Sequence, residues 1–170
     1  MPLPAVPASP ARRRRAAPDA EAGDGIVVRP VRRADLEQVI AIDTAVTGLE
    51  KRAYWASVHR RYGVGGRGDQ KFLVALHGDR VVGYVIGEVR DWEFGSPPCG
   101  WVFAISVDPA ARLAGVGTRL LDAISDAFRR AGVRKLRTLL ARDNTLILSF
   151  FRSQGLMAGP LMSLEMDLNR

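Results

Sequence analysis

Three residues near the middle of the chain have types and a spacing that suit an anion. Arg112, Gly115 and Gly117 stand in the pattern R-x-x-G-x-G, shortly after Asp108-Pro109. Glycines let successive backbone N–H groups come close to a ligand, and a helix N-terminus attracts negative charge. The pattern therefore predicts a diphosphate site where the chain enters a helix.

The segments around this turn predict the elements that position it. Residues 101–107 are mostly apolar and predict a buried strand, while apolar residues recur every four positions from Val116 to Phe128 and predict an amphipathic helix that ends near Gly132. Residues 135–141 predict another strand. A strand, helix and strand in this order indicate parallel, right-handed pairing of the two strands.

The remaining patterns complete an α/β fold. Strands are expected at 26–31, 71–76, 81–90 and 161–168, and helices at 34–48, 50–62 and 144–155. In the last strand Met162, Leu164, Met166 and Leu168 alternate with polar residues, which is typical of a half-buried strand. The expectation is a mixed sheet of six to seven strands, antiparallel in its N-terminal half, with a central parallel crossover and helices on both faces.

Composition limits the function classes. The chain has 170 residues, a formal net charge of +7, one cysteine and two histidines. Residues 1–24 are rich in Pro, Ala and Arg and are expected to form a disordered tail, with one domain over 25–170. Four of the positive charges lie in this tail, at 12–15, so the folded part is only mildly basic. Nucleic acid therefore ranks last among the expected partners. We expect no metal site, no membrane segment and no disulfide framework. The expected location is cytoplasmic.

A glycine turn alone also fits two other nucleotide-binding folds. A dinucleotide-binding glycine motif follows the first strand of its unit, with an acidic residue about 20 positions further on. A P-loop ends in Gly-Lys-Ser/Thr, whereas Gly117 is followed by Thr118 and Arg119. The order of elements therefore argues against both.

Two blocks of the sequence resemble the GNAT acyltransferase superfamily. The run ISVDPAARLAGVGTRLLDAI (105–124) is similar to its acyl-coenzyme A signature, and RDNTLILSFFRSQGL (142–156) resembles its second conserved block. The resemblance covers residues 26–168 and implies a single-domain enzyme similar to the ribosomal-protein acetyltransferases. It implies acetyl-CoA as the acyl donor and no metal.

The resemblance also implies which positions bind the coenzyme. The turn and the first helical residues would hold the diphosphate, the end of the preceding strand would pair with the pantetheine arm, and Asn144 and Phe151 would lie along the bound coenzyme. The residues implied are Ile105, Ser106, Val107, Arg112, Leu113, Ala114, Gly115, Val116, Gly117, Thr118, Asn144 and Phe151. Asn144 could equally be a helix cap, and the glycines could serve helix packing.

The catalytic groups are less complete. Many members of the family have a Tyr four residues before the Gly that ends this helix, but here Phe151 precedes Gly155 and has no proton to donate. A free thiol has a pKa near 8.5, so the coenzyme A thiolate can leave without that acid. An attacking amine must lose a proton, and Glu88 and Glu93 are the candidate bases, with Asp91 behind them.

The expected function is acetyl transfer from acetyl-CoA to a primary amine by direct attack on the thioester. A protein lysine or N-terminal amine is the first choice of acceptor, and a polyamine, antibiotic or amino acid is the alternative. A module that binds acyl-CoA without turnover is the third reading, because a clear acid and base are lacking. The expected assembly is a monomer or a homodimer.

Overall fold

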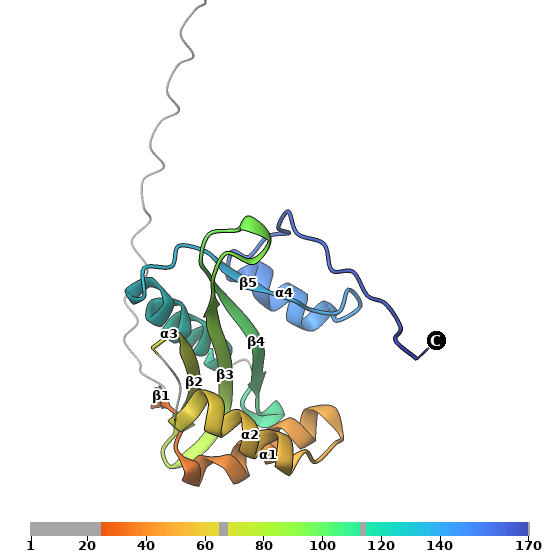
Figure 1. Cartoon of the computed structure of the whole chain (residues 1–170). Coiled ribbons are helices and arrows are strands. Elements are labelled where there is room, and N and C mark those ends of the chain that lie inside the picture. The colour runs from red at the N-terminus through yellow and green to blue at the C-terminus, as the bar shows by residue number, and fades with distance from the viewer. Residues whose placement is uncertain (1–24, 65–67, 113–114, 170) are drawn as a thin grey trace, which may run out of the picture.

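A five-stranded mixed sheet lies at the centre of the protein (Figure 1). The computed structural model describes residues 25–64, 68–112 and 115–169, so the predicted tail at 1–24 lies outside the described residues. Neighbouring strands follow the order of the sequence, with four antiparallel strands and a parallel fifth. Their bounds are β1 Ile26–Pro30, β2 Gln70–His77, β3 Arg80–Arg90, β4 Cys99–Val107 and β5 Leu136–Thr138. The predicted fold class is confirmed.

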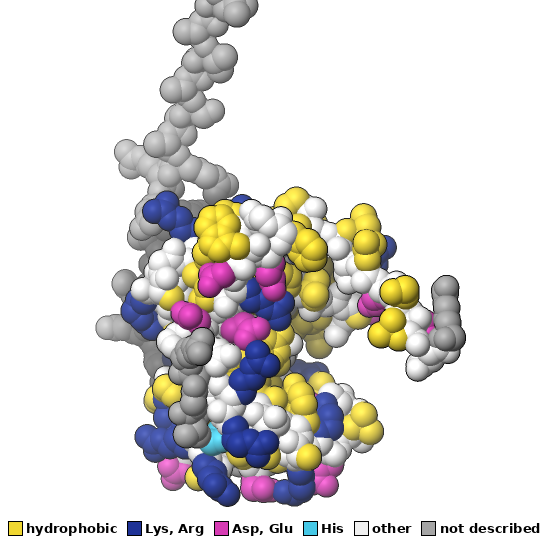
Figure 2. Space-filling view, in the orientation of Figure 1, with side chains coloured by type: hydrophobic (Ala, Val, Ile, Leu, Met, Phe, Trp, Pro, Cys, Tyr) yellow, Lys and Arg dark blue, Asp and Glu magenta, His cyan; other side chains and the backbone are white. Residues whose placement is uncertain are grey.

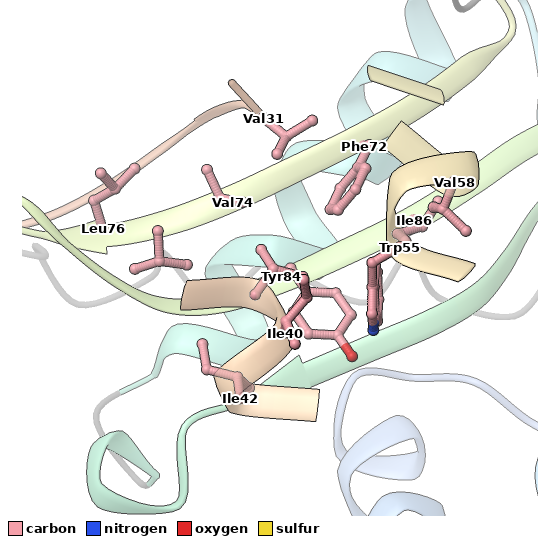
Figure 3. Close-up of a cluster of buried hydrophobic side chains, with 12 residues drawn as sticks. Val31, Ile40, Ile42, Trp55, Val58, Phe72, Val74, Leu76, Tyr84 and Ile86 are labelled. Carbon is pink, nitrogen blue, oxygen red and sulfur yellow. The ribbon is translucent and has the colours of Figure 1, made fainter. Parts of the chain in front are cut away.

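Helices cover both faces of the sheet. On one face, α1 (Leu36–Thr47), α2 (Arg52–Val58) and a π-helical turn (His59–Val64) enclose a core that includes Trp55, Phe72 and Tyr84 (Figure 3). On the other face, α3 (Val116–Arg130) and α4 (Thr145–Ser153) enclose a second core. Three short 3-10 helices lie at Arg33–Asp35, Glu93–Gly95 and Pro109–Ala111.

The predicted helix α3 forms as expected from its apolar period. Val116, Leu120, Ile124 and Phe128 are all at most 2% exposed, so the stripe of residues spaced by four faces the sheet. The chain leaves the helix through Gly132, whose positive φ of 82° suits a glycine. Among the helices that the structure describes, none is long and apolar enough to cross a bilayer.

The C-terminal segment differs from the expectation of a half-buried strand. Residues 161–168 form no strand, and the side chains of Met162, Leu164, Met166 and Leu168 are 75–86% exposed. This segment runs beyond α4 and away from the domain, and hydrophobic side chains lie on its surface (Figures 1 and 2). Alternation provides an apolar face, but a strand also needs a partner edge, and β5 has only three residues. The described sheet therefore has five strands instead of six to seven.

Asp35 links β1 to the start of α1 through hydrogen bonds. Its carboxylate accepts hydrogen bonds from the guanidinium of Arg29 at 2.7 and 2.9 Å and from the backbone N–H of Arg32 at 2.6 Å. The residue is 5% exposed. The hydrogen bond from Arg29 is the main cause that lowers the pKa of Asp35, against the opposing effect of burial.

We predict that Asp35→Asn lowers the free energy of unfolding by about 1–3 kcal/mol at pH 7, because it removes a buried charge-assisted pair. The pKa of Asp35 is lowered in the folded state, so its stabilisation is present above the ordinary carboxyl pKa and is lost as the pH falls below about 4. Urea unfolding of both proteins at pH 7 and pH 3 measures this. A stability gap that stays the same at pH 3 would contradict the assignment.

Candidate functional site at the split between β4 and β5

One extra residue in β4 separates it from β5. In the β3–β4 ladder Ile86 pairs with Ala104, but the next residue, Gly87, pairs with Val102, so Phe103 is a bulge without a partner. A bulge bends its strand and increases the local twist. The parallel pairing with β5 covers only residues 100–102 of β4 and ends at the bulge. Beyond Phe103 the two strands therefore diverge.

A cavity of about 260 Å³ lies where the strands part. Its lining residues come from α1 on one face of the sheet and from α4 on the other. Figure 2 shows the surface hollowed in this region. The lining comprises Asp43, Val46 and Thr47 of α1, Tyr84 of β3, residues 102–106 of β4, residues 138–141, and Asn144, Ile147 and Phe151.

Asp43 is the one carboxylate in this lining. It is 6% exposed, accepts a hydrogen bond of 2.9 Å from Trp55 Nε1, and forms an ion pair of 3.0 Å with Lys51. These contacts compensate for the burial of the charge. Asp43 is not among the residues predicted from the sequence, although an acidic residue directly after Ile42 on the apolar face of a predicted helix is a usable signal.

The entry to α3 has the geometry of an anion site. Gly115 is the N-cap residue with a left-handed φ of 73°, and no described side chain caps the helix. The N–H groups of the first turn therefore have no intrahelical or capping partner, which is the arrangement that binds anions. Leu113 and Ala114 lie outside the described residues.

Gly117 also has a packing role. A Cβ at this position would lie 3.1 Å from the ring of Phe150, so the glycine lets α3 approach α4 closely. Val116 is 1% exposed and belongs to the core below the turn. Arg112 is exposed beside the turn, and Thr118 is half-buried in the first turn of α3.

The structure brings several predicted coenzyme residues to the cavity. Ile105, Ser106, Asn144 and Phe151 all line it, and Val107 follows at the end of β4. Asn144 caps α4, since its side-chain oxygen accepts a hydrogen bond of 3.2 Å from the N–H of Ile147. Phe151 is 3% exposed and contributes a carbon surface without a polar atom.

The two predicted bases lie outside the cavity lining. Glu88 accepts a hydrogen bond of 3.1 Å from the Tyr62 hydroxyl and another of 3.1 Å from Arg90. The ring of Tyr62 lies 5.1 Å from that of Phe103, which does line the cavity, so the side chains of Tyr62 and Phe103 lie between Glu88 and the cavity. Glu93 is exposed and lies 3.9 Å from Arg90.

A larger hollow of about 660 Å³ lies elsewhere, along the C-terminal half of α3 and the start of β5. Its rim is basic, with Arg129, Arg134 and Lys135. None of the predicted coenzyme or catalytic residues borders it, so the cavity between β4 and β5 is the candidate site.

Gly87, opposite the bulge, leads to a stability prediction. A Cβ there would lie 2.4 Å from the carbonyl oxygen of Trp101, so Gly87→Ala should lower the free energy of unfolding by about 1–3 kcal/mol. Gly68→Ala is the matched control, because no atom of the described part of the chain lies within 4 Å of its Cβ position, and no change above about 0.5 kcal/mol is expected. Urea unfolding compares them, and equal effects would refute the steric argument.

Two curated proteins are similar to part of the chain. A mycothiol acetyltransferase from Rhodococcus erythropolis is 38% identical over 93 residues, which are 55% of this chain and 29% of that protein. An L-2,4-diaminobutyric acid acetyltransferase from Nocardia farcinica is 34% identical over 79 residues, which are 46% of this chain and 39% of that protein. The matched part thus spans less than half the length of either relative.

Solved structures share the fold over nearly their whole length. An aminoglycoside N-acetyltransferase, AAC(6')-Iy in complex with CoA, superposes with a TM-score of 0.75 at 16% identity, covering 87% of this chain and 98% of that one. A transcriptional regulator from Bacillus halodurans gives 0.71 at 18% identity, covering 84% and 99%. The profile of the acetyltransferase (GNAT) family matches residues 38–156, which include the bulge, the α3 entry and the cap of α4. The chain belongs to the GNAT acetyltransferase family.

Proposed function

We propose that the protein is an acetyl-CoA-dependent N-acetyltransferase that acetylates a primary amine of a small molecule. The cavity beyond the Phe103 bulge carries this proposal. No described strand pairs with residues 103–107 of β4 on the side of β5, so backbone groups there are available to an extended ligand. The uncapped start of α3 follows the same strand, so the unpaired end of β4 leads directly to the anion site at the start of α3.

Coenzyme A has two chemical parts that match the unpaired end of β4 and the anion site at the start of α3. Its pantetheine arm carries amide groups that would pair with Ile105 to Val107, and its diphosphate would accept hydrogen bonds from the N–H groups of Gly117 and Thr118. Arg112 would add a positive charge beside the diphosphate. Asn144 and Phe151 would border the arm near the thioester.

A small amine is favoured as the acceptor over a protein. The curated relatives are named for mycothiol and for diaminobutyric acid, and AAC(6')-Iy is named for aminoglycosides. These names support a small-molecule acceptor, and they give no support to the ribosomal-protein subclass or to the protein amine expected from the sequence.

The attacking amine must be neutral. A free amine has a pKa near 10.4, so at neutral pH it must lose a proton before or during attack. Glu88 is proposed to receive that proton through water, because it lies behind Tyr62 and Phe103 on the acceptor side. Glu93 remains the second candidate, although it is more exposed and its partner is Arg90.

Thiol release from acetyl-CoA tests the proposal with the full chain. The acceptors are L-2,4-diaminobutyrate, an aminoglycoside, a lysine-containing peptide and a peptide with a free N-terminus. Release above buffer with a small amine and none with either peptide is expected. Release with a peptide alone would restore the protein acceptor. Tight coenzyme binding without release for any amine would favour the binding module.

Gly115 allows a test of the diphosphate site that leaves the helix intact. Asp and Asn both tolerate the left-handed conformation of this residue, and a Cβ there meets no atom of the described residues within 4 Å. Only Asp adds a negative charge beside the bound diphosphate. We predict that Gly115→Asp binds CoA about tenfold or more weakly than Gly115→Asn, a difference of about 1.4 kcal/mol. Calorimetry measures both, and equal affinities would contradict the placement of the diphosphate.

A further inference from the structure

Tyr84 is a buried hydroxyl in the wall of the cavity. It lies in the middle of β3, pairs with Ser106 of β4, and is 4% exposed. Its ring is held edge-on by Trp55 at 5.1 Å and lies 6.3 Å from that of Phe72. Neighbours on two sides therefore fix the ring, and the residue still borders the cavity.

The polar end of Tyr84 points away from the apolar core. In Figure 3 its hydroxyl and the indole nitrogen of Trp55 point in the same direction, away from Val31 and Phe72. That indole nitrogen donates to Asp43, so the hydroxyl lies on the side of the core where the buried carboxylate is. Tyr84 and Phe151 thus border one cavity from opposite faces of the sheet.

The surroundings of Tyr84 keep its proton in place. Burial raises the pKa of the hydroxyl above its ordinary range and the carboxylate of Asp43 raises it further, against the opposing effect of the Ser106 side chain. A group with such a pKa is a poor acid toward a thiolate, whose conjugate acid has a pKa near 8.5. It is well suited to act as a neutral donor of a hydrogen bond to an oxygen that becomes negative.

We propose that the Tyr84 hydroxyl donates a hydrogen bond to the carbonyl oxygen of the acetyl thioester and stabilises the negative charge that develops there. This inference rests on the proposed acetyltransferase function. It also explains how Phe151 is tolerated, because the tyrosine of β3 supplies a donor in the same cavity without acting as the acid that position 151 lacks.

The reaction balances without a proton from Tyr84. The amine nitrogen bonds to the acetyl carbon, and the electron pair of the carbonyl moves onto oxygen, where Tyr84 donates its hydrogen bond. The carbonyl then re-forms, the carbon–sulfur bond breaks, and its electron pair leaves with the coenzyme A thiolate. The nitrogen loses its proton to water and the carboxylate behind it.

Tyr84→Phe removes the hydroxyl and keeps the ring. We expect kcat to fall about 100-fold, the size typical for the loss of one such donor, with little change in the dissociation constant of acetyl-CoA or in Tm. Tyr54→Phe is the matched control, since Tyr54 is 48% exposed on α2 and outside the cavity lining. A kcat of Tyr84→Phe within about twofold of the original would overturn the inference, as would a loss matched by unfolding.

A second measurement does not depend on turnover. A hydrogen bond to the carbonyl weakens its double bond, so the infrared band of bound acetyl-CoA labelled with ¹³C at the carbonyl should lie at lower wavenumber in the unaltered protein than in Tyr84→Phe. Coincident bands would refute the contact. If the bands differ but no amine is acetylated, the contact stands and the proposed function fails. If amines are acetylated and the bands coincide, only the role of Tyr84 fails.

Discussion

The site depends on the mismatch of one residue between β3 and β4. Phe103 has no partner in β3, and the parallel ladder with β5 ends at the residue before it. Without this bulge β4 and β5 would continue to pair, and their backbone N–H and C=O groups would form hydrogen bonds with each other. The bulge instead leaves the end of β4 unpaired on the side of β5, where the cavity lies.

The two cores on either side of the sheet supply different residues to this cavity. The core under α1 and α2 brings Tyr84, Trp55 and Asp43 to one end, where polar groups meet. The core under α3 and α4 brings Val116 and Phe151 to the other end, beside the helix entry. A donor held along α3 and an acceptor held beside α1 would therefore approach the same gap from opposite faces, which is the geometry that transfer between two substrates requires.

Patterns within the sequence predicted most of the fold, because they are local. The spacing of apolar residues located α3, the residue patterns at 71–76 and 81–90 located β2 and β3, and a cap was one of the two roles considered for Asn144. The bulge at Phe103 leaves no such signature, since its cause is the register between two strands. Asp43 and Tyr84 were missed because they become neighbours only after α1 packs on β3.

In the C-terminal segment a clear sequence pattern led to a strand that does not form. Its alternation of apolar and polar residues is clear in the sequence, yet a strand is defined by its partner, and residues 161–168 have none in the described chain. Position 151 is a further contrast: the sequence shows that a hydroxyl is absent there, but only the packing shows that another one borders the same cavity from β3.

The single cysteine of the chain allows opening of the sheet to be followed by thiol labelling. Cys99 is 2% exposed at the start of β4, where its sulfur lies 3.6 Å from the Arg137 guanidinium. A thiol-specific dye will therefore react with released coenzyme A and not with the folded protein. When the sheet opens, one thiol per chain becomes reactive, so the rate of slow labelling without any coenzyme measures how often β4 leaves its neighbours.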